Sequence, residues 1–184
     1  MNTTQTLTRT KWNLDPSHSE IGFKVKHLMV TNVRGEFKEY NGNIYATGDD
    51  FANTGIDLSI NPASVSTGDE KRDGHLKSAD FFDVENFKEI RFKGSSLEKI
   101  NKSEYVLHGD LTIKDVTKRI KLNTEFSGIA KDPWGATRAG FEVTGKINRK
   151  DFGLTWNAVL ETGGVMVSDE VNIKCDIQLL QQPE

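Results

Sequence analysis

Apolar and polar residues alternate with a period of two through most of the chain. Between residues 21 and 27, Ile21, Phe23 and Val25 fall on one face, and Lys24 and Lys26 fall on the other. This alternation is typical of a strand with one buried and one exposed face. It predicts eight or nine strands, over residues 11–14, 21–27, 33–40, 56–60, 90–92, 105–113, 120–126, 139–147 and 171–179.

The connections between these strands are short and rich in turn residues, as at Asn41-Gly42-Asn43 and Lys114-Asp115. Such connections favour antiparallel hairpins. Strands of this kind form either a two-sheet sandwich or a closed barrel, and periodicity alone does not separate the two. Glycine within a strand often marks a bend, and it occurs at Gly22, Gly94, Gly109 and Gly145. We therefore expect one all-β domain with a strongly curved sheet, an antiparallel barrel.

One segment departs from the alternation and predicts a short helix after residue 66. Thr67 lies three residues before Glu70, which is the spacing of a capping box. Phe81 and Phe82 follow, and both rings are too apolar to lie in water. We expect the helix and these rings to close one end of the barrel.

Three basic side chains are candidates for contact with a polar group of a ligand. His27 continues the inward series of its strand, so it either bonds a neighbour in the core or touches a ligand. Arg72 and His75 share a helix face because three residues separate them. They either meet an anionic or carbonyl head group, or belong to a charged face with an Arg-Asp salt bridge.

Other chemistry has little support in the sequence. The four histidines and one cysteine show no His-x-x-x-His or Cys-x-x-Cys spacing, so we expect no metal and no cofactor. Cys175 lies in mid-strand, where a buried, unreactive thiol is the ordinary case. Ser19 follows His18 without a Gly-x-Ser-x-Gly elbow, and we expect no catalytic residue.

Charge and length limit the class of protein further. The 184 residues carry a net charge of −3 without a block of like charge, which argues against a nucleic-acid or anionic-membrane partner. The first residues are polar and lack the apolar core of a signal peptide, so we expect a cytoplasmic protein without a stable membrane anchor. We expect a flexible segment at 1–10 and a barrel at 11–182.

Residues 151–167 are apolar but poorly periodic. Trp156, Gly163, Gly164 and Met166 fall in this stretch, which is either a mobile flap over an opening or a long hairpin packed outside the barrel.

Several segments, in this order, resemble the YceI-like family. They are Trp12-Asn13-Leu14-Asp15-Pro16-Ser17-His18-Ser19, Val25-Lys26-His27-Leu28, Val33-Arg34-Gly35-Glu36-Phe37, Arg72-Asp73-Gly74-His75-Leu76, Asp80-Phe81-Phe82-Asp83, Gly109-Asp110-Leu111-Thr112-Ile113 with Val116-Thr117-Lys118, and Arg149-Lys150-Asp151-Phe152-Gly153. Asp115 departs from the family, whose members usually carry Gly there, and many members carry a signal peptide.

The resemblance implies an eight-stranded lipocalin-like barrel with one or two short helices, which binds or carries a polyisoprenoid, an isoprenoid quinone or a related lipid. It implies a homodimer and no enzyme activity. A hydrolase or isomerase with His27 or His75 as its base, and a stress-related module with a filled barrel, are the alternatives. The expected ligand contacts are Phe23, Val25, His27, Phe37, Arg72, His75, Phe81, Phe82, Phe92 and Trp156.

Overall fold

The structure, a computed structural model, describes residues 8–48 and 51–183. Burial follows the alternation of the sequence, as in β8, where every second residue from Tyr105 to Ile113 is buried. The strands are β1 (Arg9–Leu14), β2 (Glu20–His27), β3 (Thr31–Phe37), β4 (Tyr40–Thr47), β5 (Gly55–Ile60), β6 (Val65–Ser66), β7 (Ile90–Lys99), β8 (Glu104–Ile113), β9 (Val116–Lys131), β10 (Thr137–Asn148) and β11 (Val167–Gln181). The helices are α1 (Glu70–Lys77) and three single 3-10 turns, at Pro16–His18, Pro62–Ser64 and Arg149–Phe152.

The sheet closes into a barrel because β11 pairs with β10 along one edge and with two consecutive strands along the other. β1 pairs with the end of β11, and β2 pairs with its earlier part. β1 and β2 therefore share one position in the barrel, and β3 and β4, which pair with them, share the next. With β5 and β7 to β11 these make the eight positions of a closed antiparallel barrel, which confirms the predicted architecture.

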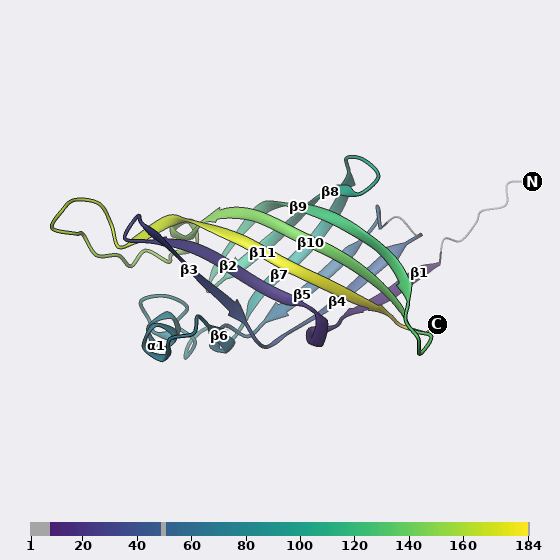
Figure 1. The fold of residues 1–184 in the computed structure, drawn as a ribbon, viewed down its shortest axis with the longest axis horizontal. Coiled ribbons are helices and arrows are strands. Elements are labelled where there is room, and N and C mark those ends of the chain that lie inside the picture. Colours follow the sequence, from purple (N-terminus) through teal and green to yellow (C-terminus); the bar gives the residue numbers. More distant parts are fainter. Residues whose placement is uncertain (1–7, 49–50, 184) are drawn as a thin grey trace, which may run out of the picture.

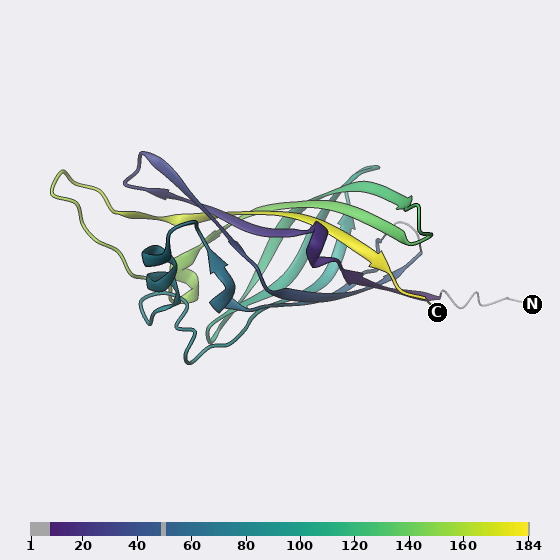
Figure 2. The ribbon, with the colours of Figure 1, turned by 60° about the horizontal axis from the view of Figure 1, so that its bottom comes forward.

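The barrel is elongated, and its two ends differ (Figure 1). β1 begins near one end, where the chain also finishes, and we call this end the floor. At the other end lie α1, the β2–β3 hairpin and the loop between Arg149 and β11, and we call it the mouth (Figures 1 and 2). Both the hairpin and the loop project beyond the body of the barrel.

Some local predictions were wrong. Asn41-Gly42-Asn43 lies inside β4 rather than in a turn, and the strand expected at 33–40 divides into β3 and β4. The N-cap of α1 is Asp69, which accepts a hydrogen bond from the backbone of Arg72, instead of Thr67. The turn at Lys114-Asp115 is confirmed, because it joins β8 to β9. Residues 1–7 of the segment expected to be flexible lie outside the described residues, and β1 begins at Arg9.

Among the described residues, no helix has both the length and the apolar character needed to cross a membrane.

Candidate functional site

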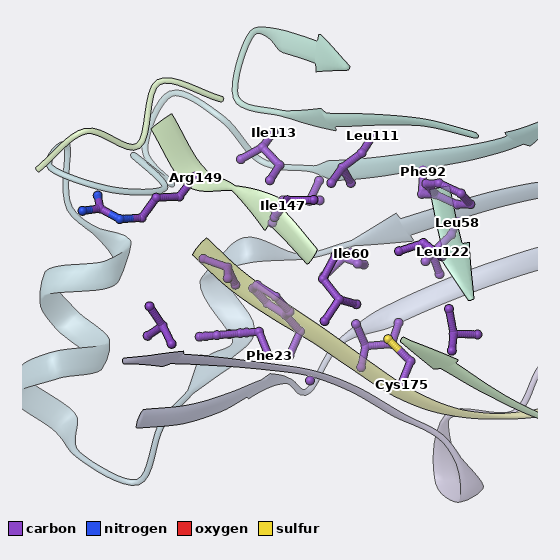
Figure 3. Close-up of a pocket in the computed structure, with 18 of the residues that line it drawn as sticks. Phe23, Leu58, Ile60, Phe92, Leu111, Ile113, Leu122, Ile147, Arg149 and Cys175 are labelled. Atoms are coloured by element: carbon purple, nitrogen blue, oxygen red, sulfur yellow. The ribbon is translucent and has the colours of Figure 1, made fainter. Parts of the chain in front are cut away.

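The barrel encloses a cavity of about 640 Å³. Its wall consists of inward-facing side chains from strands all around the barrel, among them Ile60, Phe92, Leu111, Leu122 and Cys175 (Figure 3). The interior is therefore hollow, contrary to the alternative of a barrel filled by its own side chains. All the residues expected to contact a ligand line this cavity: Phe23, Val25, His27, Phe37, Arg72, His75, Phe81, Phe82, Phe92 and Trp156.

Aromatic rings close the cavity toward the floor. Phe51, in the loop between β4 and β5, is 2% exposed and lies 5.3 Å from Trp12, 5.6 Å from Phe126 and 5.1 Å from Phe141, measured between ring centroids. Its φ of 58° is unusual for a residue other than glycine. We call these four rings the aromatic plug, and Phe51 and Phe141 form part of the cavity wall.

Two phenylalanine rings of the cavity wall pack over glycines on neighbouring strands. A Cβ on Gly109 would lie 2.3 Å from the tip of the Phe92 ring, and one on Gly35 would lie 2.4 Å from the tip of Phe23. Both rings therefore reach over a neighbouring strand at a position where any side chain would collide with them. Gly109, one of the strand glycines that favoured a curved sheet, thus also makes room for a ring of the cavity wall.

The mouth combines aromatic and polar groups. The ring of His75 lies 4.6 Å from that of Trp156 and 5.1 Å from that of Phe81, both edge to face. Its Nε2 is 2.8 Å from the Oδ2 atom of Asp80. His75 therefore presents an oriented imidazole between two aromatic rings at the opening. Phe82 packs against Phe37, so the rings after α1 lie at one end of the barrel as predicted, where they border the opening.

Arg72 and His75 have different partners. Arg72 donates from Nε to Oγ1 of Thr67 at 2.7 Å and from Nη2 to the Thr67 carbonyl at 2.9 Å, instead of forming the Arg-Asp salt bridge of one of the two alternatives. Both side chains nevertheless line the cavity, as does His27. Lys26, Lys71, Arg149 and the acidic Asp69 also line it, and the sequence did not single these out.

Arg149 is a buried cation at the mouth (Figure 3). Its side chain is 3% exposed and donates to the carbonyl oxygens of Leu154 at 2.6 Å, Trp156 at 2.8 Å, Ser168 at 2.9 Å and Val167 at 3.3 Å. Burial lowers the pKa of its guanidinium, although the charge of Asp169 opposes that shift. Arg149 therefore ties both ends of the loop 153–166 to the barrel.

This loop does not have one of the two forms considered from the sequence, the hairpin packed outside the barrel. It begins after the 3-10 turn Arg149–Phe152, contains an isolated bridge between Val159 and Val165, and projects past the mouth (Figure 1). Trp156 and Met166 at its two ends line the cavity. It is therefore not a hairpin packed along the outside of the barrel.

Few polar atoms lie deeper in the wall. Cys175 is buried, and desolvation raises the pKa of its thiol to about 11, so it is protonated near neutral pH. The hydroxyl of Thr124 is buried without a hydrogen-bond partner in the part of the chain that the structure describes. Over the same residues, no group of three or more His, Cys, Asp or Glu side chains is arranged to hold a metal ion.

Solved structures share this barrel. A Campylobacter jejuni YceI protein is 34% identical, with a TM-score of 0.73 over 93% of this chain and 97% of that one. Burkholderia cenocepacia BcnA is 22% identical, with a TM-score of 0.76 over 90% and 98%. A polyisoprenoid-binding domain from Saccharophagus degradans is 14% identical, with a TM-score of 0.69 over 93% and 98%, and shares the fold.

Sequence comparison gives the same result. The UPF0312 protein SAS2572 of Staphylococcus aureus is 38% identical over 170 residues, which are 92% of this chain and 96% of that protein. None of these relatives is named as an enzyme. The model of the YceI-like domain matches residues 12–179. The chain therefore belongs to the YceI-like family.

Proposed function

We propose that the barrel binds one long-chain apolar molecule, a polyisoprenoid, an isoprenoid quinone or a related lipid, and carries it as a homodimer. The chain of the ligand lies along the cavity and its polar head lies at the mouth. The observation that carries this proposal is an apolar cavity of about 640 Å³ that rings close at one end and polar side chains border at the other.

The shape of the cavity supports an extended ligand. Phe141 in the aromatic plug and Ile147 near the mouth are six residues apart on β10, which is about 20 Å of strand. Burial of a methylene group contributes about 0.8 kcal/mol, so a long chain gains affinity from the wall alone. The name of the Saccharophagus degradans domain, polyisoprenoid-binding, fits the same chemistry.

At the mouth, polar side chains are available for a head group. His75 and Arg72 line the opening from α1, and His27 lines it from β2. A carbonyl or an anionic oxygen would find donors there, whereas the wall deeper in the barrel offers few. The head group would therefore fix the direction in which the chain enters.

The direct test is extraction of one sample of the purified protein with organic solvent, followed by mass spectrometry, and titration of a separate, folded sample with geranylgeraniol. We expect a long-chain lipid in the extract and saturable binding on titration. Val143→Trp, which fills the bore, should reduce binding at least tenfold. Glu142→Trp, at the exposed neighbouring position, should leave it unchanged.

Absence of lipid from the extract, together with no binding of added geranylgeraniol by the folded protein, would refute the proposal. Equal binding by Val143→Trp and the parent protein would place the ligand outside the barrel. Thermal unfolding of both variants checks that each is folded.

A further inference from the structure

The tip of the β2–β3 hairpin has an unusual sequence for its backbone. Leu28 and Met29 both have positive φ angles, 54° and 60°, and the backbone N–H of Val30 donates to the carbonyl of His27 at 3.1 Å. Two central residues with positive φ are the mark of a type I′ turn, where Asn-Gly is the usual pair. Two apolar side chains therefore occupy positions that the backbone alone would give to other residues.

These side chains are also exposed. The exposed fraction is 40% for Leu28, 56% for Met29 and 80% for Val30, and Val159 in the loop 153–166 is 86% exposed. We call these four residues the apolar rim. Residues that are unfavourable both for their turn and for exposure to water are expected at functional sites.

The hairpin and the loop meet beside the cavity. The backbone N–H of Leu28 donates to the carbonyl of Met166 at 2.8 Å, and His27 pairs with Val167. His27, Met166 and Val167 all line the cavity. The apolar rim is therefore continuous with the opening, and both of its segments project past the barrel in the same direction (Figures 1 and 2).

We propose that the apolar rim docks on a lipid bilayer, so that the mouth faces the membrane. This inference rests on the proposed function, because a long-chain apolar ligand partitions into a lipid phase and would be taken from it or returned to it. Four apolar side chains around an opening are enough for a turn to enter the bilayer surface, but not for a segment to span the bilayer.

The charges beside the rim fit this partner. Between Glu20 and Glu36, at its ends away from the tip, the β2–β3 hairpin carries Lys24, Lys26 and Arg34 and no acidic residue, whereas the whole chain has a net charge of −3. The loop 153–166 contains one acid, Glu161. Charge over the whole molecule therefore does not attract an anionic surface, but the hairpin is locally positive where the rim would enter the bilayer.

Flotation with vesicles made of equal parts of phosphatidylcholine and phosphatidylglycerol tests the docking. The variant Leu28→Asn with Met29→Gly gives the turn its preferred residues, so it should keep or raise the melting temperature while it removes two apolar side chains. We expect it to lose at least about tenfold in vesicle binding. Trp134→Ala removes a larger side chain, 87% exposed, from the turn between β9 and β10 at the floor, and should bind like the parent.

The proposal is overturned if the parent protein does not float with vesicles, if the double variant floats as well as the parent, or if Trp134→Ala loses as much. It is also overturned if ultracentrifugation shows that the double variant only dissociates a dimer, since the rim would then cover a second copy. Titration with geranylgeraniol from ethanol is read separately. If the protein binds geranylgeraniol but does not float with vesicles, the docking alone is refuted. If it floats with vesicles but does not bind geranylgeraniol, the proposed ligand alone is refuted.

Discussion

Two arginines at opposite ends of β10 show how differently the barrel treats its floor and its mouth. At the floor, Arg138 donates from Nε to Asp132 at 2.8 Å and from Nη1 to Asp15 at 2.7 Å. At the mouth, Arg149 follows the same strand and is more deeply buried, yet its hydrogen bonds all go to backbone carbonyls. Its nearest carboxylate oxygen, on Asp169, is 3.7 Å away.

The difference assigns separate tasks to the two ends. The floor has paired charges and packed rings, which fix its shape and close the cavity. At the mouth, a buried cation holds the loop 153–166 through neutral backbone acceptors, and the side chain of Asn157 bonds both backbone groups of Val167. Substitutions at the floor should therefore change how far the cavity extends, and substitutions at the mouth should change how well the opening is ordered.

Phe51→Ala should have the largest effect. Removal of this ring leaves a hole in the aromatic plug and should lower the free energy of unfolding by about 3 to 5 kcal/mol, measured by urea denaturation. Because the hole continues the cavity toward the floor, the variant should also favour longer isoprenoid alcohols than the parent in a competition series.

Phe23→Ala is the matched control, because Phe23 lines the cavity on the mouth side and its loss widens the bore without lengthening it. An unchanged preference for chain length in folded Phe51→Ala would mean that the plug does not set the limit of the cavity.

Arg149→Ala should lower the free energy of unfolding by about 3 kcal/mol, because several carbonyls lose a charged donor. Amide hydrogen exchange in residues 154–168 should accelerate. Arg149→Lys should recover little, since an ammonium group cannot reproduce the planar fork of a guanidinium. Lys150→Ala, at the exposed neighbour, should change stability by less than about 0.5 kcal/mol. Unchanged exchange in Arg149→Ala would show that the loop is held by other contacts.

Asp15→Asn should have a smaller effect that depends on pH. Burial raises the pKa of this carboxyl, but hydrogen bonds from Ser17, His18 and Arg138 outweigh burial and hold the pKa well below its usual value. The ionised form therefore stabilises the fold above the unfolded pKa, and this contribution is lost as the pH falls toward the folded pKa. We expect a loss of about 1 to 2 kcal/mol at pH 7 that shrinks on acidification below about pH 4.

Urea denaturation across this pH range measures the effect. Asp57→Asn, in the exposed pair with Arg91 on the outer face, serves as the control and should cost less at pH 7. A loss in Asp15→Asn that stays constant from pH 7 into the acid range would contradict the assigned role of the carboxylate.

The sequence predicts the wall of the cavity well because alternation carries the information directly. Once Ile21 faces inward, Phe23, Val25 and His27 must follow it, whatever the exact register. The same regularity cannot divide the strand expected at 33–40 into β3 and β4. Gly42 was predicted to lie in a turn, but it lies in β4, where an added Cβ would contact Leu58 and Leu14.

The two ends were harder to predict, because their key residues have no periodic neighbours. Phe51 is a single ring in a loop, and only tertiary packing brings it to Trp12 and Phe126. Arg149 is charged and follows a strand, which normally indicates exposure. Its one signal was its place in a segment shared with the family. The capping box predicted for Thr67 and Glu70 does not form, because Thr67 donates to Asp73 instead and Asp69 caps the helix.

The short ladder between β3 and β6 has a consequence for the outline of the barrel. Only Glu36 and Phe37 pair with β6, and toward the mouth this flank is completed by α1 and by Phe82, whose ring packs against Phe37. Rings in edge-to-face contact separate without a run of backbone hydrogen bonds being broken, whereas backbone ladders join the neighbouring barrel positions elsewhere among the described strands. The mouth can therefore widen with the least loss of backbone hydrogen bonds along the flank between β3 and α1.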